Sequence, residues 1–472
     1  MWNEKSRVDG NICFDTRIGQ LNEKQLIEKY NLNGPRYTSY PTAIELKEQP
    51  LNKQSVTTAM AKSDNDELSL YIHIPFCKQL CYYCGCHKYL ARNESKAFAY
   101  VDSILEELAS WQASCNEHYK VSQIHFGGGT PTFVDNSTIS KIVGKISADY
   151  SVTENAEISI EFDPRTCDAK RLAELIEMGF NRFSFGIQDF NPETQIAINR
   201  QQDIKMIEPL VKVLKDKAIP FNFDLIYGLP YQTQSRFNDT VNQVLRLRPN
   251  RLSVFNYAHM PHLFAEQRRI DEAALPSATE KLAIQLNTMK QLTDDGYVYL
   301  GIDHYALPDD SLAQEQKKQQ LHRNFQGYTT KGHCDLLGIG LSSISQIGQL
   351  MFQNEKELSG YQHKVSNDGV AITKHLYKSL SDQARWYVIK NLICNFELNI
   401  TPYETKFGHL FNEEYKNEIA KLQTYQRDGL VKISNESIKI TDLGRLFARL
   451  ICKEFDQYLQ DKMISKQFSK AI

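Results

Sequence analysis

The feature that most restricts the fold of this chain is a regular alternation of two hydrophobic patterns from residue 68 to about residue 305. Short apolar or alternating runs, typical of strands, are separated by stretches with apolar residues at i, i+3 and i+4, typical of helices. We expect strands at residues 68–74, 122–126, 157–162, 182–187, 221–227, 251–256 and 297–302. Because strands that alternate with helices form parallel sheets, the sequence predicts an α/β protein.

Polar residues and glycines follow most of these strands. They include Gly127 to Gly129, Glu161 and Asp163, Gln188 and Asp189, Asn256 and His259, and Asp303 and His304. At any single position such residues are typical of turns. The carboxyl ends of parallel strands meet at one edge, where barrels and open sheets place their active sites. The series therefore predicts an enzyme site at that edge.

The charge balance excludes two classes of protein. The 472 residues carry 55 basic and 57 acidic side chains, a net charge of -2, so no global field attracts nucleic acid or an anionic membrane. The N-terminus has no apolar signal segment, and no run approaches the roughly 18 apolar residues that a membrane span requires. We expect a cytoplasmic, monomeric protein with a small-molecule substrate, no nucleic-acid partner and no membrane span.

Three parts of the chain differ in pattern. We expect an N-terminal arm at residues 1–60, the α/β region at residues 61–355, and a mostly helical C-terminal domain at residues 356–472. A hairpin candidate at residues 429–440, flanked by helices, resembles a winged helix. Because that region has no basic recognition face, we expect it to pack against the α/β region rather than to bind DNA.

Four of the ten cysteines, Cys77, Cys81, Cys84 and Cys86, lie within ten residues, directly after the first expected strand. Without a secretion signal, such clustering favours metal or redox chemistry over disulfides. Two metal sites fit the spacing. A closed zinc site would recruit Cys86 or His87 as an additional ligand. An iron-sulfur cluster held by three cysteines would leave one iron open to a substrate or cofactor.

The spacing Cys-x3-Cys-x2-Cys resembles the signature of the radical S-adenosylmethionine (SAM) enzymes. The longer string at residues 71–86 is similar to that of the oxygen-independent coproporphyrinogen III oxidase family. The similarity extends over nearly the whole chain, at residues 34–42, 125–132, 157–165, 185–190, 224–230, 251–259, 322–330 and 467–469.

This resemblance implies a partial (β/α) barrel with an N-terminal arm and a helical C-terminal domain. It implies that Cys77, Cys81 and Cys84 hold a 4Fe-4S cluster, that Cys86 is not a ligand, and that two SAM molecules bind. The residues implied for the first SAM are Tyr71, Gly128, Glu161 and Ile344. Those implied for the second are Tyr83, Gly129, Thr130, Gln188, Arg200, Asp224 and Ala258.

The implied reaction is the oxidative decarboxylation of two propionates of coproporphyrinogen III to vinyl groups, giving protoporphyrinogen IX in anaerobic haem biosynthesis. An electron donor such as a flavodoxin or ferredoxin would reduce the cluster. Such chemistry relies on positioning, so we expect no acid-base side chain. Candidates for holding the propionates are Arg36 and the stretch His322, Arg323 and Asn324.

Two alternatives remain at this point. A haem chaperone of the same superfamily shares the barrel but typically lacks the Gly-Cys pair that follows the third cluster cysteine. Gly85 and Cys86 are present here, and together with Gln188 they favour an enzyme. Another radical reaction on a different substrate is the second alternative, which the C-terminal domain and residues 322–330 disfavour.

Overall fold

The structure is a computed structural model that describes residues 23–49 and 51–460. The similarity at residues 467–469 lies outside the described residues. None of the helices in the described part of the chain has the length and apolar character needed to cross a membrane.

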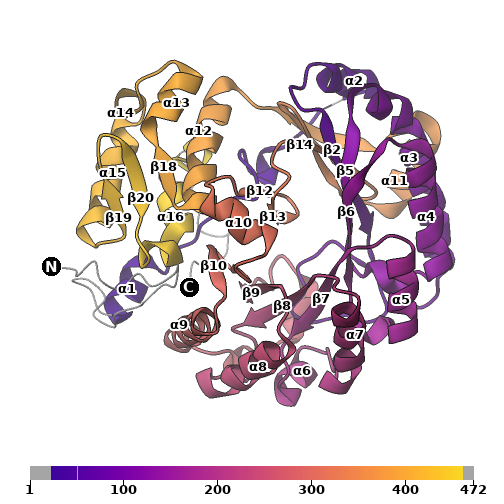
Figure 1. The fold of residues 1–472 in the computed structure, drawn as a ribbon, viewed down its shortest axis with the longest axis horizontal. Coiled ribbons are helices and arrows are strands. Elements are labelled where there is room, and N and C mark those ends of the chain that lie inside the picture. The colour runs from indigo at the N-terminus through magenta and orange to yellow at the C-terminus, as the bar shows by residue number, and fades with distance from the viewer. Residues whose placement is uncertain (1–22, 50, 461–472) are drawn as a thin grey trace.

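Six parallel strands form the centre of a 13-stranded sheet. In spatial order they are β2 (Glu67–Ile74), β5 (Lys120–Gly128), β6 (Val152–Phe162), β7 (Arg182–Gln188), β8 (Phe221–Tyr227) and β9 (Arg251–Asn256). The connecting helices α3 (Ser95–His118), α4 (Asn136–Asp149), α5 (Ala169–Glu177), α7 (Ile204–Asp216) and α8 (Gln234–Leu247) cover the outer face (Figure 1). This arrangement confirms the expected partial (β/α) barrel.

The strand expected at residues 297–302 is present, but the expectation that it continues the parallel series is wrong. β10 (Val298–Gly301) pairs antiparallel with β11 (His304–Ala306), which in turn pairs antiparallel with β9. Gly301 and Ile302 have φ values of 118° and 53°, a left-handed pair that reverses the chain within a few residues. The helix α9 (Ala278–Asp294) still connects β9 to β10, but the barrel ends in an antiparallel hairpin.

The opposite edge of the sheet is also antiparallel. β14 (Cys334–Ile339) pairs in parallel with β2, and β15 (Ile344–Ile347), β16 (Leu350–Asn354) and β17 (Ile372–Tyr377) follow as antiparallel neighbours. The helix α11 (Leu358–Asp368), between β16 and β17, packs on α3 of the barrel. The large sheet thus continues to Tyr377, whereas the sequence pattern places the end of the α/β region at residue 355.

The C-terminal part contains α12 (Leu380–Lys390), α13 (Ile400–Phe407), α15 (Lys416–Arg427) and α16 (Ala448–Lys453) around a three-stranded sheet. The expected hairpin is formed by β19 (Val431–Ile433) and β20 (Ser437–Ile440), and β18 (Glu397–Asn399) adds a third strand. A second hairpin, β12 (His322–Asn324) and β13 (Gly327–Thr329), lies between this domain and the barrel (Figure 1).

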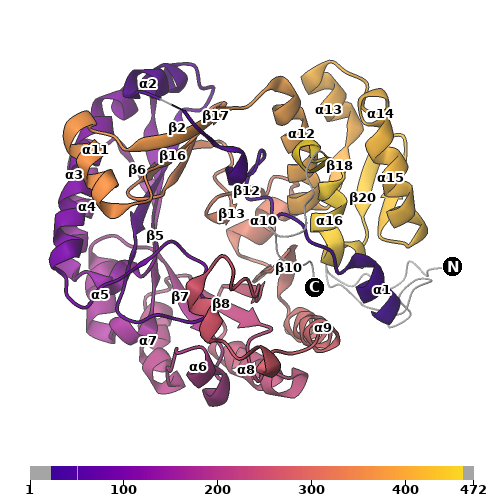
Figure 2. The same cartoon turned by 180° about the vertical axis from the view of Figure 1, so that it is seen from behind.

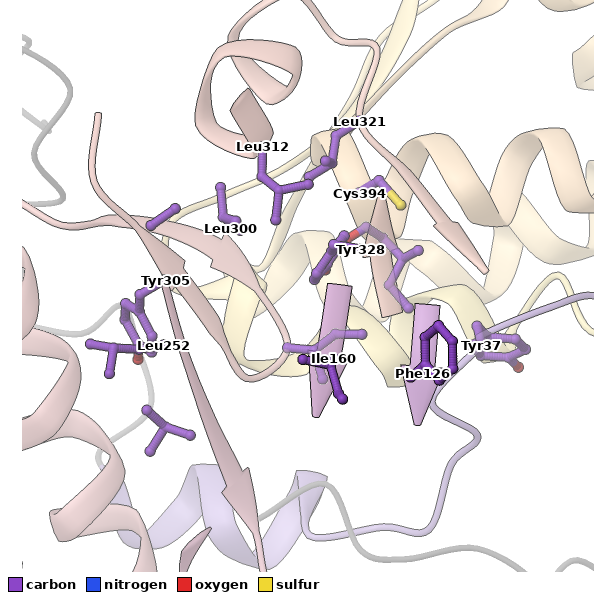
Figure 3. Close-up of a cluster of buried hydrophobic side chains, with 14 of the residues drawn as sticks. Tyr37, Phe126, Ile160, Leu252, Leu300, Tyr305, Leu312, Leu321, Tyr328 and Cys394 are labelled. Atoms are coloured by element: carbon purple, nitrogen blue, oxygen red, sulfur yellow. The ribbon is translucent and has the colours of Figure 1, made fainter. Parts of the chain in front are cut away.

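One hydrophobic core joins the barrel to the C-terminal domain. Figure 3 shows Phe126, Ile160 and Leu252 of the barrel strands in the same buried cluster as Tyr328 and Cys394. The hydroxyl of Tyr328 also donates a hydrogen bond to the carbonyl of Ile393, at 3.2 Å. Because burial of apolar surface is the main stabilising contribution to folding, the two regions support each other.

The described end of the N-terminal arm runs between the two regions (Figure 2). Tyr37 and Tyr40 are each 1% exposed, and the hydroxyl of Tyr37 donates to Asp456 at 3.0 Å. Arg36 of the same segment pairs with Asp303, which follows β10, at 2.6 Å. The arm is therefore part of the folded core and brings Arg36 to the carboxyl side of the barrel.

Candidate active site

A cavity of about 1210 Å³ lies at the carboxyl ends of the parallel strands. Each of the six strands contributes to it, either directly or through the loop that follows. Its wall includes twelve of the residues that the sequence singles out: Cys77, Cys81, Tyr83, Cys84, Gly128, Gly129, Thr130, Glu161, Gln188, Arg200, Asp224 and Ala258. The edge predicted from the polar residues after the strands is thus the wall of one cavity.

The cysteine loop is held at its base by a short ribbon. β3 (Phe76–Cys77) pairs with β4 (Tyr89–Leu90), which closes the intervening loop, and the buried Phe76 anchors it in the core. Cys77 Sγ lies 3.4 Å from the hydroxyl of Thr130, and Cys81 Sγ accepts hydrogen bonds from Arg200 and Arg165 at 3.6 and 3.7 Å. Such donors stabilise thiolates, the form of cysteine that binds metal.

The geometry of the four sulfurs helps to distinguish the disulfide, the closed zinc site and the iron-sulfur cluster. The nine cysteines within the described residues are free thiols. Among those residues, no three of the loop sulfurs lie within 4.8 Å of one another, whereas sulfurs bound to one zinc at about 2.3 Å stand about 3.8 Å apart. His87, the other zinc candidate, places Nε2 2.9 Å from the Lys356 carbonyl. The donor set fits a wider iron-sulfur cluster better than a closed zinc site.

The glycines after β5 are required by the close approach of β2. Gly128 has φ 118°, and a Cβ there would lie 2.6 Å from the His73 ring. A Cβ on Gly129 would lie 2.5 Å from the Pro75 carbonyl oxygen. Since neither position has room for a side chain, the backbone of this turn forms the cavity wall directly.

Glu161 of β6 is an ionised acceptor on the cavity wall. It accepts hydrogen bonds from His125 Nε2 at 3.2 Å and from the Gly128 amide at 3.3 Å. Burial disfavours the charged form, but these hydrogen bonds outweigh it and lower the pKa of Glu161. Its partner is therefore His125, which the series of polar residues after the strands does not include.

Arg200 is fixed in a buried ion-pair network. Its Nη1 lies 2.9 Å from Asp163, which also pairs with Arg165 at 2.6 Å, and its Nε donates to the Gly186 carbonyl at 3.2 Å. Burial opposes ionisation of Asp163, but the charges of Arg200 and Arg165 lower its pKa. Asp163 belongs to the series of polar residues after strands that predicted a site at this edge, whereas the sequence did not single out Arg165.

Two further wall residues differ in their hydrogen bonding. Gln188 ends β7 in a left-handed conformation, φ 66°, and its buried Oε1 has no hydrogen-bond partner among the described residues. Asp224 of β8 accepts from Asn222 at 2.8 Å and from the Ser184 hydroxyl at 3.0 Å. Burial, together with repulsion from Glu161, raises the pKa of Asp224 to about 6. Gln188 thus offers an unused acceptor and Asp224 a carboxyl that resists ionisation.

Two of the expected residues are not on this wall. Tyr71 stacks on His125 with ring centroids 5.9 Å apart, and its hydroxyl lies 2.9 Å from His73 Nδ1. Ile344 begins β15, opposite Gln353 of β16. The structure places both residues behind or beside the wall formed by the other twelve.

Two family profiles match this chain. The radical SAM superfamily profile matches residues 71–244, which hold the cysteine loop and the barrel strands from the second half of β2 through β8. The fold and the site thus define a radical SAM protein. A second profile, the HemN C-terminal domain, matches residues 379–447.

The relatives are similar over almost their entire length. The oxygen-independent coproporphyrinogen III oxidase of Salmonella typhimurium (strain LT2) is 46% identical over 448 residues, covering 95% of this chain and 98% of the relative. That of Escherichia coli (strain K12) is 45% identical with the same coverage. The solved structure of coproporphyrinogen III oxidase (HemN) from Escherichia coli superposes with a TM-score of 0.87 at 44% identity, over 90% of this chain and 97% of that one. This chain belongs to the oxygen-independent coproporphyrinogen III oxidase family, a family of oxidoreductases.

Proposed function

We propose that this protein converts two propionate side chains of coproporphyrinogen III to vinyl groups by oxidative decarboxylation, giving protoporphyrinogen IX in anaerobic haem biosynthesis. The observation that carries the proposal is the single cavity that the cysteine loop after β2 shares with polar groups from the five strands β5 to β9. Its volume of about 1210 Å³ exceeds the roughly 300–1,000 Å³ of ordinary small-molecule pockets, as a tetrapyrrole bound beside nucleotide cofactors requires.

Cys77, Cys81 and Cys84 would hold a 4Fe-4S cluster, with two SAM molecules beside it. When bound, these groups supply one-electron chemistry that produces a hydrogen-abstracting carbon radical. The chain's own residues would bind and orient the cluster and the SAM molecules. Thr130, Arg165 and Arg200 donate to the thiolates of Cys77 and Cys81.

The SAM contacts are assigned to the two groups named from the sequence. Glu161 is the best supported residue of the first group, because it is an ionised acceptor that faces the cavity beside the Gly128 turn. Tyr71, in the same group, would act indirectly, since its hydroxyl lies against His73. In the second group, the unpartnered carbonyl of Gln188 can accept a hydrogen bond from a ligand. Arg200 would contribute charge while remaining paired with Asp163.

Exclusion of water is the other task of the fold, because solvent destroys radical intermediates. The arm residue Arg36 and the hairpin residues Gln326 and Tyr328 contribute to the cavity wall beside β9 and β11. These residues come from outside the repeated strand-helix units. The arm and the hairpin therefore complete an enclosure that the barrel alone leaves open.

The test is turnover by anaerobically reconstituted protein supplied with a reductant and SAM. Release of carbon dioxide and formation of protoporphyrinogen from coproporphyrinogen are expected, with none from a Cys81→Ala control. Carbon dioxide release equal to that of the control would refute the proposal. Tight haem binding without turnover would instead identify the chaperone alternative.

A further inference from the structure

Several buried polar atoms at the β9–β11 end of the cavity have no partner. Within the described residues, His304 Nδ1, Gln326 Nε2, Asn256 Oδ1 and both Nε and Nη1 of Arg323 make no hydrogen bond. His304, Gln326 and Asn256 line the cavity. Because a buried polar atom without a partner is costly, so many in one place indicate a polar ligand.

These atoms belong to one continuous layer of side chains. Arg36 lies over the Phe255 ring at 5.6 Å, and the ring of Phe255 is 5.8 Å from that of His304. The His304 ring is 5.0 Å from that of Tyr328, and the guanidinium of Arg323 lies 4.7 Å from the same Tyr328 ring. The layer thus connects the arm, β9, β11 and the β12–β13 hairpin, with an arginine at each end.

The charge of this layer is positive. Arg36 is paired with Asp303, whereas Arg323, only 6% exposed, has no ion-pair partner within the described residues. Burial, reinforced by the nearby charges of Arg323 and Arg36, holds the pKa of His304 well below its usual value, so its imidazole is neutral. A buried guanidinium without a counter-charge favours binding of an anion.

We propose that Arg323, Gln326 and His304, which we call the carboxylate pocket, bind one propionate of the tetrapyrrole. Gln326 Nε2 and the Nδ1–H tautomer of His304 donate hydrogen bonds from the cavity wall, and Arg323, behind Tyr328, supplies the positive charge. This inference rests on the proposed function and adds to it the part of the cavity that holds a substrate carboxylate.

The same contacts separate the propionate candidates predicted from the sequence. His322 lies near Lys390, with 3.5 Å between Nε2 and Nζ, and Asn324 accepts the backbone N–H of Gln326 in the hairpin turn. Both side chains thus have partners of their own, whereas Nε and Nη1 of Arg323 have none within the described residues. Arg36, on the cavity wall, and Arg323, in contact with the wall residue Tyr328, therefore remain as the two cations at this end of the cavity.

The experiment is a fluorescence titration with coproporphyrin III, the oxidised analogue of the substrate, using cluster-loaded protein with SAM and no reductant. Arg323→Gln should raise Kd about ten-fold, the effect of losing one charge-assisted interaction. Gln326→Leu should raise it about three-fold, as expected for a neutral hydrogen bond. The tetramethyl ester of coproporphyrin, which has no carboxylate, should bind wild type and both variants equally.

Arg385→Gln is the matched control. Arg385 also lies over a tyrosine ring, Tyr415 at 5.2 Å, but it belongs to the C-terminal domain and pairs with Glu418 at 3.0 Å. This variant should leave the Kd of coproporphyrin unchanged. If Arg323→Gln fails to fold in a thermal unfolding measurement, Gln326→Leu decides the question.

Unchanged coproporphyrin binding in the folded variants would overturn the carboxylate pocket while leaving the proposed function intact, provided that wild type still releases carbon dioxide from coproporphyrinogen. An equal loss of ester binding in Arg323→Gln or Gln326→Leu would also overturn it, because the effect would not depend on the carboxylate. A wild-type protein that neither binds coproporphyrin nor releases carbon dioxide would overturn the proposed function itself.

Discussion

The two ends of the cavity differ in how completely their polar groups are partnered. At the cysteine end, Asp163 is bound by both Arg200 and Arg165, and the same arginines donate to Cys81. At the β9–β11 end, Gln326 and Arg323 carry buried atoms without partners among the described residues. A site for a resident cluster can be organised in advance by the protein, whereas a site for a substrate that leaves must keep its donors available.

The largest effect is expected where the cysteine end loses a ligand. Cys81→Ala should abolish turnover and remove nearly all iron and acid-labile sulfide, because a cluster held by two thiolates is not retained. Iron and sulfide analysis with absorption spectroscopy measures this. Cys115→Ala, which alters a buried cysteine of α3 outside the cavity wall, should retain the cluster. A colourless wild-type protein that contains zinc would contradict the assignment.

Breaking the ion-pair network at the same end should have the largest effect on stability. Asp163→Asn should lower the free energy of unfolding by about 3–5 kcal/mol, because it leaves the buried Arg200 without its counter-charge. Urea unfolding measures the change. The matched control is Asp216→Asn, which removes an exposed pair with Lys212 and should cost less than about 0.5 kcal/mol. Equal effects of the two substitutions would show that the network is not a stabilising element.

Asp224 differs from Asp163 in the direction of its pKa shift: the pKa of Asp224 is raised, and that of Asp163 is lowered. Its folded-state pKa of about 6 lies above the ordinary aspartate value of 3.8, so the folded state binds the proton more tightly than the unfolded state. The contribution of Asp224 should therefore lower the free energy of unfolding as pH rises from about 4 to 6, by up to about 3 kcal/mol.

Asp224→Asn should remove this dependence, so that the variant gains stability relative to wild type as pH rises through that range. Chemical unfolding of both proteins at pH 4, 5, 6 and 7 measures whether the stability difference between the variant and wild type changes in this direction. Asp163, whose pKa is lowered, should show the opposite trend, because its stabilising contribution is lost as pH falls. A constant difference between wild type and Asp224→Asn across these pH values would contradict the expected shift.

The smallest effect on stability is expected for Gln188→Met. Because the Oε1 of Gln188 has no partner within the described residues, replacing the amide should change the free energy of unfolding by less than about 1 kcal/mol. The same substitution should weaken SAM binding, measured by equilibrium dialysis with cluster-loaded protein. A large loss of stability with unchanged SAM binding would make Gln188 a structural residue rather than a ligand contact.

The parts of the site that follow local rules could be predicted from the sequence. Glu161, Gln188 and Asp224 lie on strands or at strand ends, and the parallel pairing of β6, β7 and β8 brings them to one wall. The partners of these residues could not be predicted. His125 reaches Glu161 only because β5 and β6 pair in a particular register, and strand periodicity does not specify register between segments.

The antiparallel edges and the assembly of the carboxylate pocket could not be predicted from the sequence pattern, although Arg323 was a propionate candidate and His304 was one of the polar residues after the strands. The reversal after β10 depends on backbone angles at Gly301 and Ile302, and a short apolar run does not reveal the direction of its strand. Gln326 and Arg323 belong to a hairpin outside the strand-helix repeat, and the shared core with the C-terminal domain sets its position. Gln326 and Arg323 come close to His304 only through the packing of distant segments, which local sequence patterns do not specify.

The position of the arm has a consequence for biosynthesis of the protein. Tyr37 is bonded to Asp456, and the carbonyl of Pro35 accepts a hydrogen bond from Arg449, so residues near the start of the described chain depend on residues near its end. On a ribosome, Pro35 and Tyr37 are made long before Arg449 and Asp456, so these two hydrogen bonds can form only after the C-terminal residues have emerged. Arg36 lies between Pro35 and Tyr37, so the two contacts that hold this segment of the cavity wall involve residues made more than 400 positions later.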